Sequence, residues 1–295
     1  MQTYTRLEQE KEAKLLSDSQ LPPEWPTKGA IRFENATLRY RDDFKPALTN
    51  INFHIEPKMK VGVVGRTGAG KSSLLHALFR LTECDRPSSI FLDDTSTSRV
   101  GLATLRSALS IILQSPFIFE GTVRENLDPF RSYSDQELWD ALHDVHLKQV
   151  VLRFPLKLSE RIAEGGGGGG ATFSVGEKQL MCVARAILGR KKILVLDEAT
   201  ANVDMETDGV IQETIKRKFS ECTVITVAHR LDTVIGSDRI LVMKGGEAVE
   251  FGHPHVLLQN REGNFSGMVA ATGKVKEQAL KETAHRAFDS LEATV

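Results

Sequence analysis

The sequence of 295 residues has few of the features that mark secreted or membrane-spanning chains. Its three cysteines, Cys84, Cys182 and Cys222, are odd in number, widely spaced and without a C-x-x-C pair. They support neither a disulfide framework nor a zinc site, and they fit a reducing compartment. All apolar runs fall short of the roughly 18 residues that a membrane span needs. The polar start MQTYTRLEQEKEAK is no signal peptide, so we expect the chain to be soluble when expressed alone.

Positive charge is not in excess either, since 38 lysines and arginines face 39 aspartates and glutamates, for a formal net charge of -1. Aromatic residues make up 6% of the chain and do not interleave with a stripe of basic residues. We therefore expect no nucleic-acid partner. The hydrophobic fraction of 41% is ordinary for a globular core, and the length allows one large domain or two modest ones.

One octet carries the strongest chemical signal, because it fits the phosphate-binding pattern G-x-x-x-x-G-K-[ST]. Its residues are Gly65, Arg66, Thr67, Gly68, Ala69, Gly70, Lys71 and Ser72. An apolar run precedes it and a helix-like run follows, so backbone N–H groups and a helix dipole can hold an anion. Lys71 can reach the terminal phosphates, and the Ser72 hydroxyl can hold Mg²⁺. A glycine turn beside a surface lysine is the competing interpretation, since average composition yields such an octet in on the order of one chain in a hundred.

Two carboxylates follow a second apolar run. The segment 193–196 leads directly into Asp197 and Glu198, and ligands of parallel α/β sheets bind at this carboxyl end of the strands. Asp197 is predicted to hold Mg²⁺, and Glu198 to act as general base on an attacking water. A pair of solvated loop acids is the alternative interpretation. Upstream, a helix that opens at Ser174 offers a second set of N–H donors for phosphate.

Hydrophobic patterning predicts an α/β fold with two kinds of strand. Short, almost continuously apolar runs predict parallel strands covered by helices on both faces, at 60–64, 193–196, 223–227 and 239–243. Partial alternation of apolar and polar residues predicts an antiparallel flank at 31–40 and 48–55.

Four segments are predicted along the chain. Residues 1–28, charged and then punctuated by proline, are interpreted as a linker into a domain of residues 29–272. Within it, residues from about 115 to 190 carry helical spacing and predict an inserted α-helical subdomain, whose glycine run 165–170 is expected to be flexible. The end, 273–295, has apolar residues at helical spacing. Docking on a partner helix and a frayed, solvated tail are both compatible with it.

The order of these motifs resembles the nucleotide-binding domains of ABC ATPases. Six motifs follow in the family's order: the phosphate loop 65–72, Gln114, a signature helix from Ser174, the acidic strand end 193–198, the segment 201–204 and His229. The resemblance runs from about residue 29 to residue 272. Finer details resemble the multidrug-resistance-associated subfamily and its second, C-terminal nucleotide-binding domain, namely Trp25-Pro26, 38–40, 114–119, 126–130, 197–201 and 249–252.

This resemblance implies a P-loop NTPase core with ATP and Mg²⁺ as cofactors. The implied nucleotide contacts are Tyr40, the octet 65–72, Ser73, Ser174, Gly176, Glu177 and Asp204. The implied metal ligands are Ser72, Gln114 and Asp197, and the implied catalytic residues are Glu198, His229 and Gln114.

Each implied role has a plainer alternative. Tyr40 would stack on adenine, although a tyrosine at a strand edge is otherwise the simpler interpretation. Gln114 would line the magnesium and water site and report nucleotide state to a membrane domain. Without the resemblance, a Gln-Ser-Pro sequence simply indicates a turn. His229 would hydrogen-bond the γ-phosphate and position water beside Glu198. Without the resemblance, a lone histidine at this place is more often a loop residue whose hydrogen bonds are satisfied locally. Asp204 would cross to an opposite subunit.

The signature segment 173–177 departs from the family's leucine-serine-glycine-glycine-glutamine. Phe173 and Val175 are familiar replacements in this subfamily's second domain, whereas Glu177 is less so and adds a carboxylate near a site for triphosphate. The glycine run 165–170 resembles an expansion of a two-glycine segment and is expected to loosen the signature helix.

The resemblance implies a head-to-tail dimer with a second nucleotide-binding domain, each ATP lying between the phosphate loop of one copy and the signature of the other. The implied function is ATP hydrolysis for an exporter of organic anions, drugs or thiol conjugates, at the cytoplasmic face of a membrane and coupled to membrane-spanning domains. The alternative is a nucleotide-sensing regulatory module of a channel or transporter. A soluble ABC protein of translation or repair is a third possibility, but those usually carry two such domains or long coiled-coil insertions.

Overall fold

The larger of two β-sheets is built from the short apolar runs of the sequence. The computed structural model describes residues 10–162, 171–200 and 203–292. Six strands lie in the order β12 (Glu247–Gly252), β11 (Arg239–Lys244), β3 (Lys60–Val64), β10 (Thr223–Val227), β9 (Ile193–Asp197) and β6 (Leu109–Ile112). Neighbours are parallel except β11 and β12. The four predicted parallel strands are confirmed. The sixth strand, β6, has only four residues and was not predicted.

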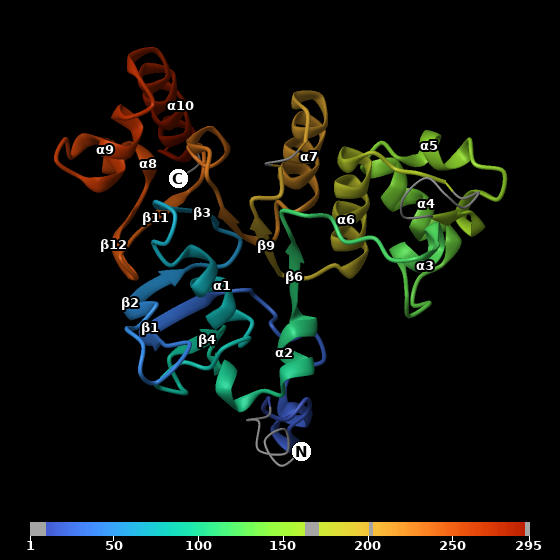
Figure 1. Cartoon of the computed structure of the whole chain (residues 1–295), viewed down its shortest axis with the longest axis horizontal. Coiled ribbons are helices and arrows are strands. Elements are labelled where there is room, and N and C mark those ends of the chain that lie inside the picture. Colours follow the sequence, from blue (N-terminus) through green and yellow to red (C-terminus); the bar gives the residue numbers. More distant parts are fainter. Residues whose placement is uncertain (1–9, 163–170, 201–202, 293–295) are drawn as a thin grey trace.

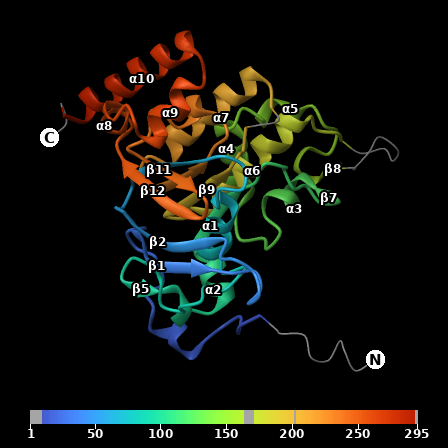
Figure 2. The ribbon, with the colours of Figure 1, turned by 60° about the vertical axis from the view of Figure 1, so that its left-hand side comes forward.

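The smaller sheet is antiparallel. Its order is β2 (Leu48–Ile55), β1 (Ile31–Leu38), β4 (Ile90–Leu92) and β5 (Thr95–Ser96), and β1 and β2 lie side by side in Figure 2. Buried residues recur along β2 at the spacing of a half-buried strand. Phe33 and Phe53 from this sheet share one apolar core with Leu74 of α1 (Lys71–Leu78). The predicted α/β class with an antiparallel flank is thereby confirmed.

A group of helices lies to one side of the larger sheet (Figure 1). It consists of α3 (Val123–Leu127), α4 (Asp135–Asp144), α5 (Lys148–Leu152), η4 (Lys157–Ser159) and α6 (Val175–Gly189). Leu138 and Leu142 of α4 are fully buried in its apolar core, as their helical spacing indicates. The region also holds two short paired strands, β7 (Gly121–Thr122) and β8 (Arg161–Ile162). The glycine run 165–170 lies outside the described residues.

The C-terminal tail docks on its own chain. Helices α8 (Pro254–Gln259), α9 (Asn264–Ala270) and α10 (Lys274–Glu292) follow β12 and lie together in Figures 1 and 2. Leu280 and Ala284 of α10 are buried with Phe265 and Val269 of α9 in one apolar cluster. Of the two interpretations of this tail, docking is the one observed. Within the described ranges, no helix is long and apolar enough to cross a membrane.

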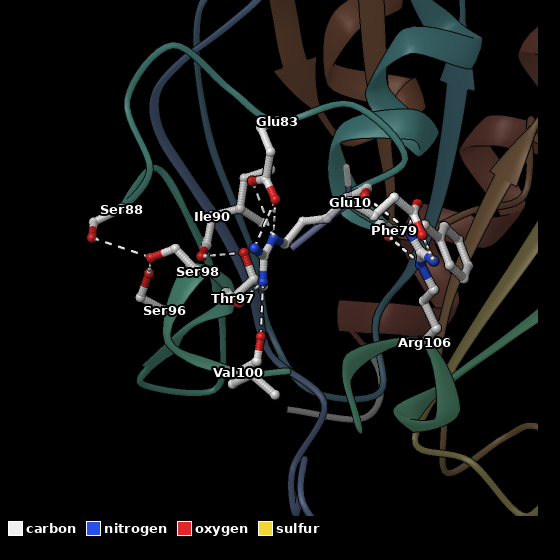
Figure 3. A network of polar contacts seen from close by, with 11 residues as sticks. Glu10, Phe79, Glu83, Ser88, Ile90, Ser96, Thr97, Ser98, Val100 and Arg106 are labelled. Carbon is white, nitrogen blue, oxygen red and sulfur yellow. Dashed lines mark hydrogen bonds and ion pairs between the residues drawn. The ribbon is translucent and has the colours of Figure 1, made fainter. Parts of the chain in front are cut away.

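The described part of the predicted linker also docks, on α2 (Leu102–Ala108). Within the short 3₁₀ helix η2 (Leu16–Gln20), the Asp18 carboxylate accepts hydrogen bonds from Gly101 N–H at 2.9 Å and the Thr104 hydroxyl at 2.7 Å. Glu10 pairs with the Arg106 guanidinium at 2.6 Å. Arg106 also donates to the Phe79 carbonyl that follows α1 (Figure 3). The segment before the domain is therefore tied to the far end of the helix that begins at the phosphate loop.

Candidate functional site

Strand register brings four chain segments to one edge of the larger sheet. Val63 of β3 pairs with Val227 of β10, which pairs in turn with Asp197 of β9. Ile112 of β6 pairs with Leu196 of β9. Because these four strands are parallel, the residues that follow them lie along a shared carboxyl edge. Those residues are the phosphate loop from Gly65, His229, Glu198 and Gln114.

The phosphate loop enters α1 through two glycines with left-handed backbone angles. Gly68 has φ 78° and Gly70 has φ 104°, values that residues with a Cβ rarely adopt. Among the described residues, no side chain caps α1, and its first turn holds no acid. Hydroxyl side chains cap the first turns of α3, α4 and α6. Because the first N–H groups of a helix have no intrahelical partner, those of α1 remain as donors for an anion.

Lys71, the first residue of α1, reaches back across this loop. The residue is 6% exposed, and its ammonium donates to the carbonyls of Gly65 at 2.8 Å and Arg66 at 3.4 Å. Burial lowers the pKa of Lys71, against the opposing effect of Glu198 and then Asp197. The ammonium thus contacts the loop directly and interacts electrostatically with both acids. The other residues of the loop and Ser73, which follows it, differ in exposure. Arg66, Thr67, Gly68 and Ser72 are exposed, Gly65, Gly70 and Ser73 are half-buried, and Ala69 is buried.

The two acids differ in their surroundings. Nε2 of His229 lies 2.5 Å from Oε1 of Glu198, whose side chain is 16% exposed. Glu198 has a φ of 51°, an uncommon value for a residue with a side chain, and its N–H donates to the Val227 carbonyl at 3.0 Å. The chain therefore turns sharply directly after β9. This turn places Glu198 against His229.

Asp197 lies in an environment that favours a bound cation. Burial and then Glu198 raise the pKa of Asp197, so its charged form is disfavoured in the protein alone. Hydroxyl, amide and carboxylate oxygens are the ligands that Mg²⁺ prefers. The predicted ligands Ser72, Gln114 and Asp197 supply these groups, and strand register places Gln114 and Asp197 at the same edge. The residues present therefore fit Mg²⁺ by donor chemistry.

Tyr40 lies against the first turns of α1, close to the phosphate loop. Its hydroxyl is 3.0 Å from Ser73 Oγ and 3.0 Å from Nδ1 of His76. The tyrosine remains 48% exposed. No role was predicted for His76. The signal that was available is the spacing of three residues between Ser73 and His76, which puts both on one helix face.

The signature segment forms the capped start of α6. Ser174 accepts a hydrogen bond from Glu177 N–H at 3.2 Å, and Glu177 accepts one from Ser174 N–H at 2.8 Å. This reciprocal box explains Glu177 locally, but it occupies N–H groups that were predicted to be free for phosphate. A Cβ on Gly176 would lie 3.0 Å from Thr207 of α7 (Met205–Lys218), so glycine allows the two helices to approach.

Several predicted residues are not brought to the shared edge. Asp204 caps α7 by accepting from Thr207 N–H at 2.9 Å, and its neighbours Ala201 and Asn202 lie outside the described residues. Gln114, by contrast, follows β6 at the shared edge and is exposed there. Over the part of the chain that the structure describes, no hydrogen bond or ion pair joins Asp204 or the start of α6 to the phosphate loop. One chain therefore assembles the loop and the acids, but not the signature, around a single site.

Comparisons with known proteins agree with this geometry. A model of the ABC transporter family matches residues 48–201. ATP-binding cassette sub-family C member 4 of Homo sapiens is 47% identical over 285 residues, covering 97% of this chain and 21% of that protein. The probable multidrug resistance-associated protein lethal(2)03659 of Drosophila melanogaster is 47% identical over 290 residues, with 97% and 21% covered. The chain thus spans about one fifth of the length of these relatives.

A solved structure shares the fold. It is described as a bacterial Atm1-family ABC exporter with ATP bound, and it is 30% identical with a TM-score of 0.73. The match covers 83% of this chain and 42% of that one.

Proposed function

The chain belongs to the ABC transporter family, and from that premise we propose that it binds Mg-ATP and hydrolyses it to ADP and phosphate. The resemblance to the multidrug-resistance-associated subfamily is confirmed by the relatives. A place as the second, C-terminal nucleotide-binding domain stays a prediction. The proposal is supported above all by the shared strand edge, where the phosphate loop, the acids, His229 and Gln114 meet.

The proposed binding roles follow from the donors at this edge. The uncapped first turn of α1 and the Lys71 ammonium hold the phosphates. Ser72, Asp197 and Gln114 are proposed to hold Mg²⁺, which when bound neutralises charge on the β- and γ-phosphates. Tyr40 supplies a stacking face for the base.

The proposed catalytic roles follow from the contact between Glu198 and His229. Glu198 accepts the proton of a water that attacks the γ-phosphorus. His229, 2.5 Å from the Glu198 carboxylate, hydrogen-bonds the γ-phosphate and aligns the water. Gln114, at the end of β6, lines the water side of the site. In this proposal His229 and Gln114 orient the water and the γ-phosphate, while Glu198 takes the proton.

The signature segment completes a site on a second domain in this proposal. Among the described residues, Ser174, Gly176, Glu177 and Asp204 make no hydrogen bond or ion pair with the chain's own phosphate loop, and we propose that they face the loop of a head-to-tail partner. We propose that residues 29–272 form this ATP-binding domain, with 1–28 as linker, a helical subdomain at about 115–190 and a tail at 273–295. We propose further that this domain works in an exporter with membrane-spanning domains and lies at the cytoplasmic face of a membrane. The proposed cargo of that exporter is organic anions, drugs or thiol conjugates.

A nucleotide-sensing regulatory module with little hydrolysis is the second candidate. The reciprocal capping box of Ser174 and Glu177 favours it, because N–H groups that a partner's triphosphate needs are engaged within the chain. The contact of Glu198 with His229 favours hydrolysis instead. Measured turnover in the presence of a partner domain separates the two candidates.

The isolated chain is expected to bind Mg-ATP clearly but to hydrolyse it weakly. In a homodimer each site is closed by a signature segment with a carboxylate at Glu177. If the preceding glycine run is flexible, as its composition predicts, ordering it costs roughly 1 kcal/mol or more per residue. Phosphate release should therefore rise when a first-type nucleotide-binding domain with a consensus signature is added. Robust cooperative hydrolysis by the purified chain alone would favour a self-sufficient homodimer. The variant Glu177→Gln can keep the capping box without the negative charge, so it separates the effect of that charge on hydrolysis from the effect of the local structure.

Tyr40→Ala should weaken ATP binding by roughly 1–2 kcal/mol through lost stacking. Tyr40→Trp should have a smaller effect, because it restores an aromatic face. Titration with a fluorescent ATP analogue measures both. Equal losses in the two variants would indicate that Tyr40 is structural.

A further inference from the structure

The hydroxyl of Tyr40 is held by two side chains of α1, one of which has no role in the proposed function. Ser73 Oγ and His76 Nδ1 each lie 3.0 Å from it. The rings of Tyr40 and His76 meet edge to face, with centroids 5.9 Å apart and planes at 87°. We propose that His76 is a positioning residue that holds the Tyr40 ring ready to stack on a nucleobase. This inference rests on the proposed nucleotide-binding function.

Both ends of the Tyr40 side chain are constrained. Its backbone comes two residues after β1, and its hydroxyl is tied to α1. A tyrosine hydroxyl donates one proton and also accepts, so it can donate to Ser73 Oγ while accepting from Nδ1–H of His76. The two rotatable bonds of the side chain are thereby fixed. Since Tyr40 is still 48% exposed, ring surface remains open to a base.

His76 lies on the same face of α1 as Ser73, which comes three residues earlier, and this face meets the Tyr40 side chain. Lys71 begins the same helix of eight residues. One rigid element therefore carries both the phosphate-binding lysine and the group that holds the stacking ring. The spacing between phosphate and base recognition is set within α1.

The test compares a ligand that has a base with one that lacks it. His76→Ala should weaken Mg-ATP binding by about threefold to tenfold, the range that ordering one side chain costs. Binding of inorganic tripolyphosphate with Mg²⁺ should change by less than about twofold, because no ring is involved. His76→Asn, which keeps a hydrogen-bonding group near Nδ1, should restore ATP affinity. His54→Ala, at an exposed histidine on β2, is the matched control.

A double-mutant cycle identifies the contact. Tyr40→Phe removes the hydroxyl and should reproduce the loss seen in His76→Ala, and combining both changes should add nothing further. Three results would overturn the role of His76 and leave the proposed function standing. They are unchanged ATP affinity in His76→Ala, equal losses of affinity for ATP and tripolyphosphate, and additive losses in the double variant. A parent chain that binds neither ligand would overturn the proposed function together with the role of His76.

Discussion

Replacing Lys71 with alanine should abolish measurable ATP binding. The lysine is 6% exposed, and its ammonium already bridges the phosphate loop through the Gly65 and Arg66 carbonyls. In the proposed complex it faces the β- and γ-phosphates, and truncating one partner of such a buried charge pair costs about 2–5 kcal/mol or more. Titration with a fluorescent ATP analogue in the presence of Mg²⁺ measures the loss.

Two further variants separate charge from folding in this experiment. Lys71→Met keeps an unbranched side chain at the start of α1 without the ammonium, and it should lose ATP as Lys71→Ala does. Lys216→Ala removes an exposed lysine from α7 and should bind as the parent does. Unchanged nucleotide affinity in both Lys71 variants would rule out the assigned phosphate loop.

Changing Glu198 to glutamine should leave ATP binding intact and remove turnover. The amide keeps the size of the side chain and its contact with His229, but it cannot take the proton of the attacking water. Loss of a general base typically lowers the rate by about 10²–10⁴-fold. With hydrolysis blocked, ATP-bound dimers should accumulate, which size-exclusion chromatography with Mg-ATP detects beside a phosphate-release assay.

The assignment of the base depends on the rate in this variant. Hydrolysis by Glu198→Gln at the parent rate would mean that Glu198 is not the base. His229, whose Nε2 lies 2.5 Å from the Glu198 carboxylate, would then become the better candidate. Both assays include a partner nucleotide-binding domain, because the chain alone is expected to hydrolyse ATP slowly.

Local sequence was enough to predict the phosphate loop and the strands that lead into the site. Left-handed angles at Gly68 and Gly70 follow from residue type, because glycine alone adopts them without strain. Continuous apolar runs predicted β3, β9, β10 and β11, since strands covered on both faces need such runs. The acids at the end of β9 were visible for the same reason. Glu177 looked like a misplaced charge, although its spacing of three residues from Ser174 fits a capping box, which the structure shows.

Other features depend on partners that are distant in the sequence. The predicted linker carried no sign of its docking on α2 through Asp18. His76 gained its relation to Tyr40 only in three dimensions, because 36 residues separate the two.

The sequence by itself determined which chemical groups this protein has and the local structure that carries each one. Backbone angles, apolar periodicity and helix starts depend on a few neighbouring residues, so they can be read in order along the chain. Only the tertiary structure decided which groups meet. The strand order β3, β10, β9, β6 aligns Lys71, His229, Glu198 and Gln114 at one edge, although their order along the chain is different. Pairing between distant strands sets that order, because the sheet's buried faces are satisfied only by packing of the whole domain.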